Sequence, residues 1–141
     1  MIREFLFTCL AGHLLFLAPA TGTAEGIKVV YHLADEQSAT LAMHNMTNHL
    51  AADADARIVM VALARGVKVF TFGAQDAGGK PFADWVDTLS VRGVEFRICQ
   101  NSMNAMKLTA KDLIDKVTAV PSGVAEIARL QAREGFVYIK P

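Results

Sequence analysis

Residues 57–63 have the sequence Arg-Ile-Val-Met-Val-Ala-Leu, an unbroken apolar run that follows one charged residue. The run is short and rich in β-branched residues. A strand with helices on both faces has this composition, because neither face meets water. The run therefore predicts a central strand in a parallel sheet.

Strand-like and helix-like segments alternate on both sides of this run. β-branched and aromatic residues dominate the strand-like segments, and apolar residues recur at helical spacing between them. Strands and helices that alternate in this way form an α/β fold, with a parallel sheet and right-handed crossovers. The predicted strands are residues 27–33, 57–63, 67–72, 94–99, 117–120 and 136–139, and the predicted helices carry the stripes Ala39, Met43, Met46, Leu50, then Phe82, Trp85, Val86, Leu89, then Val124, Ile127, Leu130. A pattern resembling a capping box at residues 109–112 predicts a further helix through Ile114.

The first 24 residues differ from the rest and predict a secretory signal peptide. A charged start precedes an almost uncharged apolar run from Phe5 to Ala18, and small residues close it. The predicted cleavage follows Ala24 or Ala20, which leaves one domain over residues 25–141. The alternatives are an uncleaved anchor, although the run is shorter than the roughly 20 residues that span a bilayer, and a misassigned start. The mature protein is expected to be exported, to the periplasm in a Gram-negative bacterium, and to have no membrane contact after cleavage.

Charge and motifs argue against several classes of partner and ligand. Lys and Arg total 14 and Asp and Glu total 14, so no basic excess indicates a nucleic-acid partner. No phosphate-binding glycine motif follows a predicted strand, and we predict no cofactor. No CxxC or HExxH motif is present, and His44 and His49 have the wrong spacing for one helix face, so we predict no metal site.

Cys99 is the best candidate for a reactive side chain. Signal cleavage removes Cys9 and leaves Cys99 as the one thiol, which cannot form an intrachain disulfide. Cys99 ends a predicted strand, and Asn101 or Ser102 opens a helical turn whose free N–H groups favour a thiolate. Arg97 lies two residues earlier on the same strand face, where its cation can approach the sulfur. The alternative is a buried cysteine that packs as a small hydrophobe.

His32 ends the first predicted strand. The carboxyl ends of parallel strands line the crevice where ligands of such folds bind. A histidine there can carry a proton or orient a ligand, and the alternative is a purely structural hydrogen bond.

Four segments together resemble the DsrE/DsrF-like family, over about residues 27–141. The resemblance rests on KVVYHL at 28–33, VEFRICQNSM at 94–103, VPSGVAE at 120–126 and LQAREGFVYIKP at 130–141. It implies a three-layer α/β/α sandwich around a mainly parallel sheet of five or six strands, assembled as a homotrimer or homohexamer. Relatives tend to have a glycine-rich turn after the second strand, whereas this chain has Ala64-Arg65-Gly66.

The same resemblance implies sulfur-relay chemistry, in which a cysteine accepts sulfane sulfur as a persulfide and passes it on. Cys99 matches the position of that cysteine, with His32, Arg97, Asn101 and Ser102 as candidate binding residues. The expected partners are a sulfur donor or acceptor protein or a small sulfur species, and the resemblance implies a sulfurtransferase or a sulfur carrier. The alternatives are a non-catalytic homo-oligomeric binding module and a thiol redox sensor that forms an interchain disulfide.

Overall fold

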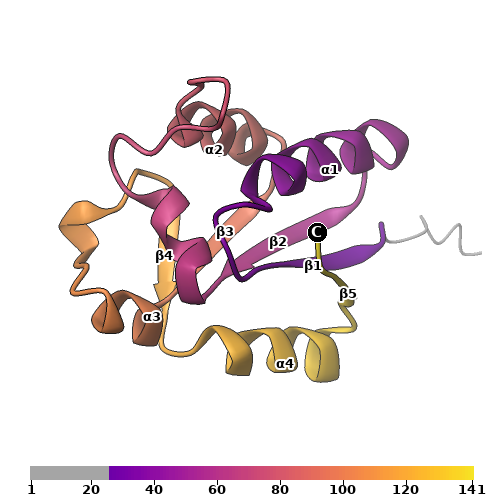
Figure 1. Ribbon diagram of the computed structural model, residues 1–141. Helices are drawn as coiled ribbons and strands as arrows, with labels where there is room; N and C mark the ends of the chain where they lie inside the picture. The colour runs from indigo at the N-terminus through magenta and orange to yellow at the C-terminus, as the bar shows by residue number, and fades with distance from the viewer. Residues whose placement is uncertain (1–25) are drawn as a thin grey trace, which may run out of the picture.

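The five strands of the sheet all run parallel, in the spatial order β4-β3-β2-β1-β5 (Figure 1). The structure is a computed structural model that describes residues 26–141. The predicted signal peptide, residues 1–24, lies outside the described residues. The strands are β1 Lys28–Leu33, β2 Arg57–Ala62, β3 Glu95–Cys99, β4 Val117–Val120 and β5 Val137–Ile139; the α-helices are α1 Ala39–Ala52, α2 Phe82–Val91, α3 Gln100–Ala105 and α4 Gly123–Glu134; the 3-10 helices are η1 Ala64–Phe70 and η2 Ala110–Asp112.

Helices cover both faces of the sheet, which confirms the predicted three-layer sandwich. Figure 1 shows α1 and α2 above the sheet and α4 below it. On β2, Met60 packs into the larger core with α1 and α2, whereas Val59 and Val61 pack with α4. All three are fully buried, and burial of a side chain of this size stabilises the fold by about 1.5–3 kcal/mol. Because both faces of β2 are buried, polar and apolar residues do not alternate along this strand.

The path of the chain brings distant segments together at the carboxyl ends of the central strands. From β1 the sheet grows in one direction through β2, β3 and β4, and α4 then carries the chain back to β5 beside β1. The crossover starts at Gly123, directly after β4, so the amino end of α4 lies at the end of β3. Loops in this position line the ligand crevice of open α/β sheets.

The strand predicted at residues 67–72 is wrong, because η1 occupies residues 64–70. Val67, Val69 and Phe70 are all buried in the larger core, and strict alternation would have sent Phe70 to the opposite face from the two valines. Gly66 allows this tight turn, since its N–H donates to the carbonyl of Ala34 at 3.1 Å and its Cα lies against the backbone of Leu33. The sheet therefore has five strands and not six.

Two further predictions are corrected. The helix predicted through Ile114 is only the 3-10 turn η2, although its capping box is present. Leu113 lies outside this turn, where it forms an antiparallel β-bridge with Thr71 and is buried. Val124, which the helical stripe placed in the core, is 65% exposed, and Ile127 and Leu130 alone of that stripe are buried. Gly135 ends α4 in the left-handed conformation, with φ +74°. Within residues 26–141, no helix combines the length and the apolar character needed to cross a membrane.

We predict that Gly66→Ala destabilises the fold by about 1–3 kcal/mol, the usual cost of overpacking. A Cβ at this position would lie 2.4 Å from the carbonyl oxygen of Leu33, which the strand cannot move aside. Urea unfolding measures the change. Gly78→Ala is the matched control, because there the nearest atom is a side-chain oxygen at 3.3 Å, and a cost below about 0.5 kcal/mol is expected. Equal stability of the two variants would contradict the packing of η1 against β1.

Candidate functional site

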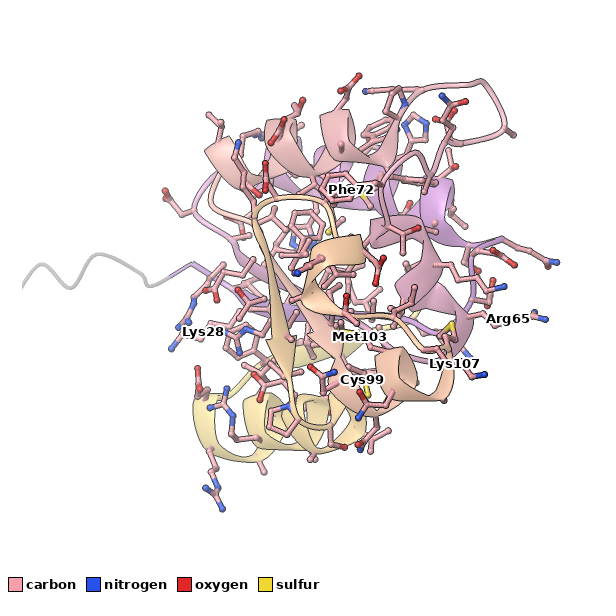
Figure 2. The ribbon with its side chains drawn as sticks, turned by 90° about the vertical axis from the view of Figure 1, so that its left-hand side faces the viewer. Lys28, Arg65, Phe72, Cys99, Met103 and Lys107 are labelled. Carbon is pink, nitrogen blue, oxygen red and sulfur yellow. The ribbon has the colours of Figure 1, made fainter. Side chains whose placement is uncertain are left out.

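Cys99 lies at the junction between a strand and two helices. It is the last residue of β3 and the N-cap of α3, and Figure 2 shows it between α3 and α4. The residue is 5% exposed, so only a small part of it meets solvent. The prediction that this cysteine precedes a helical turn is confirmed by α3.

Polar hydrogens surround the sulfur and lower the pKa of the thiol. Burial alone raises that pKa, but hydrogen bonds from the Ser102 hydroxyl and from the N–H groups of Gly123, Ser102 and Asn101 act in the opposite direction and outweigh burial. Each of these donors stabilises the thiolate more than the thiol. The net result is a pKa below the usual value of a cysteine, which favours the nucleophilic form.

Gly123 brings a second helix to the sulfur, from a part of the chain that is 24 residues distant. It is the first residue of α4, and a Cβ there would lie 3.1 Å from the Cβ atoms of both Cys99 and Leu63. A side chain at position 123 would crowd both residues, and glycine avoids this contact. The N-terminal end of this helix carries a partial positive charge, which also favours a thiolate.

Ser102 connects the sulfur to the loop after β2. Its Oγ accepts a hydrogen bond from the Ala64 N–H at 2.8 Å. A hydroxyl has one proton and two acceptor positions, so this contact leaves the proton of Ser102 available to the sulfur. Ala64 reaches Ser102 with φ +47°, an uncommon value for a residue other than glycine.

Arg97 lies on the same strand face as Cys99, but its guanidinium is directed elsewhere. It forms ion pairs with Glu126 of α4 and with Glu95, the latter at 2.6 Å. The side chains of Arg97 and Glu126 are 15% and 12% exposed. The guanidinium of Arg97 is therefore ion-paired with two carboxylates.

His32 belongs to a separate cluster, on β1. Two steps across the sheet separate β1 from β3, or roughly 10 Å. His32 Nδ1 shares a hydrogen bond of 2.6 Å with the Tyr138 hydroxyl, and Nε2 is buried without a partner. Burial lowers the pKa of His32, and Lys140 lowers it further. The structure thus brings Asn101 and Ser102 to the sulfur, but it does not bring His32 there.

Sequence reasoning missed Gly123 and Ala64 as parts of the site. Ser122 and Gly123 belong to the VPSGVAE segment, but the contact of Gly123 with Cys99 depends on the order of the strands. The arrangement can hold an anionic sulfur atom and direct it as a nucleophile. No cluster of three or more His, Cys, Asp or Glu side chains suited to a metal is found over residues 26–141.

Comparison with known proteins finds a matching family and similar solved structures for this chain. The profile of the DsrE/DsrF-like family matches residues 28–141. The protein of unknown function MTH1491 from Methanobacterium thermoautotrophicum is 32% identical and superimposes with a TM-score of 0.72, over 82% of this chain and 99% of its own. The ychN protein of E. coli superimposes with a TM-score of 0.66 at 13% identity, over 83% of this chain and 99% of its own, which shows a shared fold. No curated protein matches the chain.

We predict that Ser102→Ala raises the pKa of Cys99, because the sulfur loses one side-chain donor. A hydrogen bond to a charged group contributes about 1.5–3 kcal/mol, so below the pKa of the thiol the thiolate fraction should fall about tenfold or more. The thiolate absorbance, measured against pH with Cys99→Ser as the blank, gives this fraction. Asn104→Ala is the control, since its side chain bonds Gln100 instead. An unchanged titration in Ser102→Ala would contradict the assigned hydrogen bond.

The lowered pKa of Cys99 also makes the stability of the fold depend on pH. Since the folded-state pKa of Cys99 is below the unfolded value, ionisation stabilises the fold above the unfolded pKa. That contribution is lost as the pH falls through the folded-state pKa. We expect it to be smaller in Ser102→Ala.

Proposed function

This chain belongs to the DsrE/DsrF-like family, and from that premise we propose that it is an exported sulfur-relay protein whose Cys99 binds sulfane sulfur as a persulfide. The family supports sulfur-relay function in general. The observation that carries the specific proposal is the close approach of the amino end of α4 to Cys99, which together with the Ser102 hydroxyl lowers the pKa of the thiol and favours its thiolate. A buried cysteine that served only packing would gain nothing from these donors.

The proposed step is an exchange at sulfur. The Cys99 thiolate attacks a sulfane sulfur of a polysulfide or of a donor protein's persulfide. A new S–S bond forms at Cys99 as the S–S bond of the donor breaks, and the electron pair of the broken bond leaves with the shortened donor. The reaction needs no external oxidant, because sulfur is transferred with its oxidation state conserved. A thiol on the acceptor then reverses the exchange and removes the sulfur.

The donors at Cys99 all act on the same charge in this step. The N–H groups of Asn101 and Gly123 and the hydroxyl of Ser102 stabilise the attacking thiolate. The terminal sulfur of the persulfide, one S–S bond further out, also carries a negative charge, which the same donors favour. Because Cys99 is only 5% exposed, we expect a slender donor, such as an inorganic polysulfide or an extended persulfide side chain.

Assembly and export are parts of the proposal that rest on separate features. The exposed apolar residues Val124, Val137 and Tyr138, together with a net charge of zero, support a homotrimer or homohexamer. The particle mass from light scattering tests this, and a monomer would contradict it. The pattern of residues 1–24 supports export, and N-terminal sequencing of the secreted form should begin near Glu25.

We predict that the protein gains the mass of one sulfur atom when it is incubated with polysulfide, and that Cys99→Ser does not. A reducing agent should remove the added sulfur, because persulfides are labile to thiols. Mass spectrometry of the intact chain measures the gain. The Cys99→Ser variant also controls for Cys9 in the full-length chain. Equal gain on both proteins, or no gain on either, would contradict the proposed function.

The second candidate function is a non-catalytic binding module, and the 5% exposure of Cys99 is the observation that favours it. In that case a thiol reagent should react with Cys99 only after denaturation. The sulfur-relay proposal requires reaction of the native protein at neutral pH, faster than that of an ordinary buried thiol. The low exposure of Cys99 argues against the redox-sensor alternative, because an interchain disulfide requires two sulfur atoms within about 2 Å of each other.

A further inference from the structure

The first turn of α4 has little hydrophobic anchorage. The buried apolar side chains of α4 are Ile127 and Leu130, both in its second turn. In the first turn Gly123 has no side chain, and Val124 is 65% exposed. Packing therefore fixes the middle of the helix, and another interaction must fix the end that approaches Cys99.

A closed ring of alternating charges fastens α4 to the sheet. It contains three acids and three bases, which come from β2, β3 and α4, so that its net charge is zero. Arg97 and Glu95 lie 2.6 Å apart, and Arg129 and Glu126 lie 2.8 Å apart. The order around the ring is Arg57, Glu95, Arg97, Glu126, Arg129, Glu134 and back to Arg57, at 3.5 Å from Arg57 to Glu95 and 3.8 Å from Arg57 to Glu134.

The Arg97–Glu126 pair differs from the rest of the ring in its place and its burial. Its side chains are 15% and 12% exposed, whereas the side chains of Arg57 and Glu95 are 47% and 45% exposed. Charges that are shielded from water interact more strongly than exposed ones. Glu126 also lies in the first turn of α4, three residues after Gly123, and Arg97 lies two residues before Cys99.

We propose that the Arg97–Glu126 ion pair is a positioning device, which holds the first turn of α4 on β3 so that the Gly123 N–H stays directed at the Cys99 sulfur. Neither residue touches the sulfur donor, and both act through the helix. The inference rests on the proposed function only in that Cys99 is used as a thiolate. It also gives Arg97 a role that sequence reasoning did not assign to it.

The signs of two substitutions separate positioning from simple electrostatics. If the two charges acted on the sulfur directly, Arg97→Met would disfavour the thiolate and Glu126→Ala would favour it, because the second variant removes a negative charge. If the pair acts by positioning, both variants disfavour the thiolate, since either one releases the Gly123 N–H. Glu126→Ala is therefore the decisive variant.

The experiment titrates the thiolate absorbance of Cys99 in the full chain, with Cys99→Ser as the blank. We expect Arg97→Met and Glu126→Ala each to lower the thiolate fraction about threefold to tenfold below the midpoint, the size of a helix-terminus interaction. Glu134→Ala is the matched control, because it removes the same charge from the far end of α4, about 12 Å from Glu126 along the helix axis. We expect it to change the fraction by less than about twofold, since effects at one helix end fall off within a turn.

A second measurement reports on position alone. The Gly123 amide hydrogen should exchange faster with solvent in Arg97→Met and Glu126→Ala than in the wild type or in Glu134→Ala. Should Arg97→Met fail to fold, Glu126→Ala decides, because alanine supports a helix at that place. A higher thiolate fraction in Glu126→Ala, or no change in it, would overturn the proposal. Neither readout uses a sulfur donor, so the positioning role and the persulfide chemistry succeed or fail separately.

Discussion

One backbone contact, the approach of Gly123 to Cys99, connects the fold of this protein with the ionisation of its thiol. A Cβ at position 123 would lie 3.1 Å from that of the cysteine, so the absence of a side chain at residue 123 lets the two segments pack without crowding. Through it, an N–H group at the start of α4 reaches the sulfur. The same residue starts α4, the helix that carries the chain from β4 to β5. Fold and reactivity thus share a single constraint.

Two opposing effects act on the Cys99 thiol, and their balance decides its ionisation. Burial of the sulfur disfavours the charged form, and this is the largest single effect. Several donors together outweigh it, because each is already oriented by a helix or by a neighbouring loop. Preorganised donors in a shielded place stabilise an anion better than water would, since they need no reorientation. Burial and activation are therefore compatible here, provided that a slender reagent can reach the sulfur.

Charged side chains have a structural part at a distance from the sulfur. The ring of alternating charges that includes Arg97 and Glu126 joins α4 to β2 and β3 with no net charge. The packing of Ile127 and Leu130 sets the distance between helix and sheet, and the ring resists rotation and sliding. The precision of the site at Cys99 thus depends on both kinds of contact.

The amino-acid sequence by itself determined the alternation of strands and helices, the double burial of β2 and the place of Cys99 at the start of α3. These features depend on residue periodicity and on neighbours in the sequence, so the sequence is enough to predict them. Only the tertiary structure decided that residues 64–70 form η1, that Arg97 pairs with Glu126 and that Gly123 meets Cys99. The physical reason is that these contacts join segments that the strand order brings together, and the order of strands follows from the packing of the whole sheet.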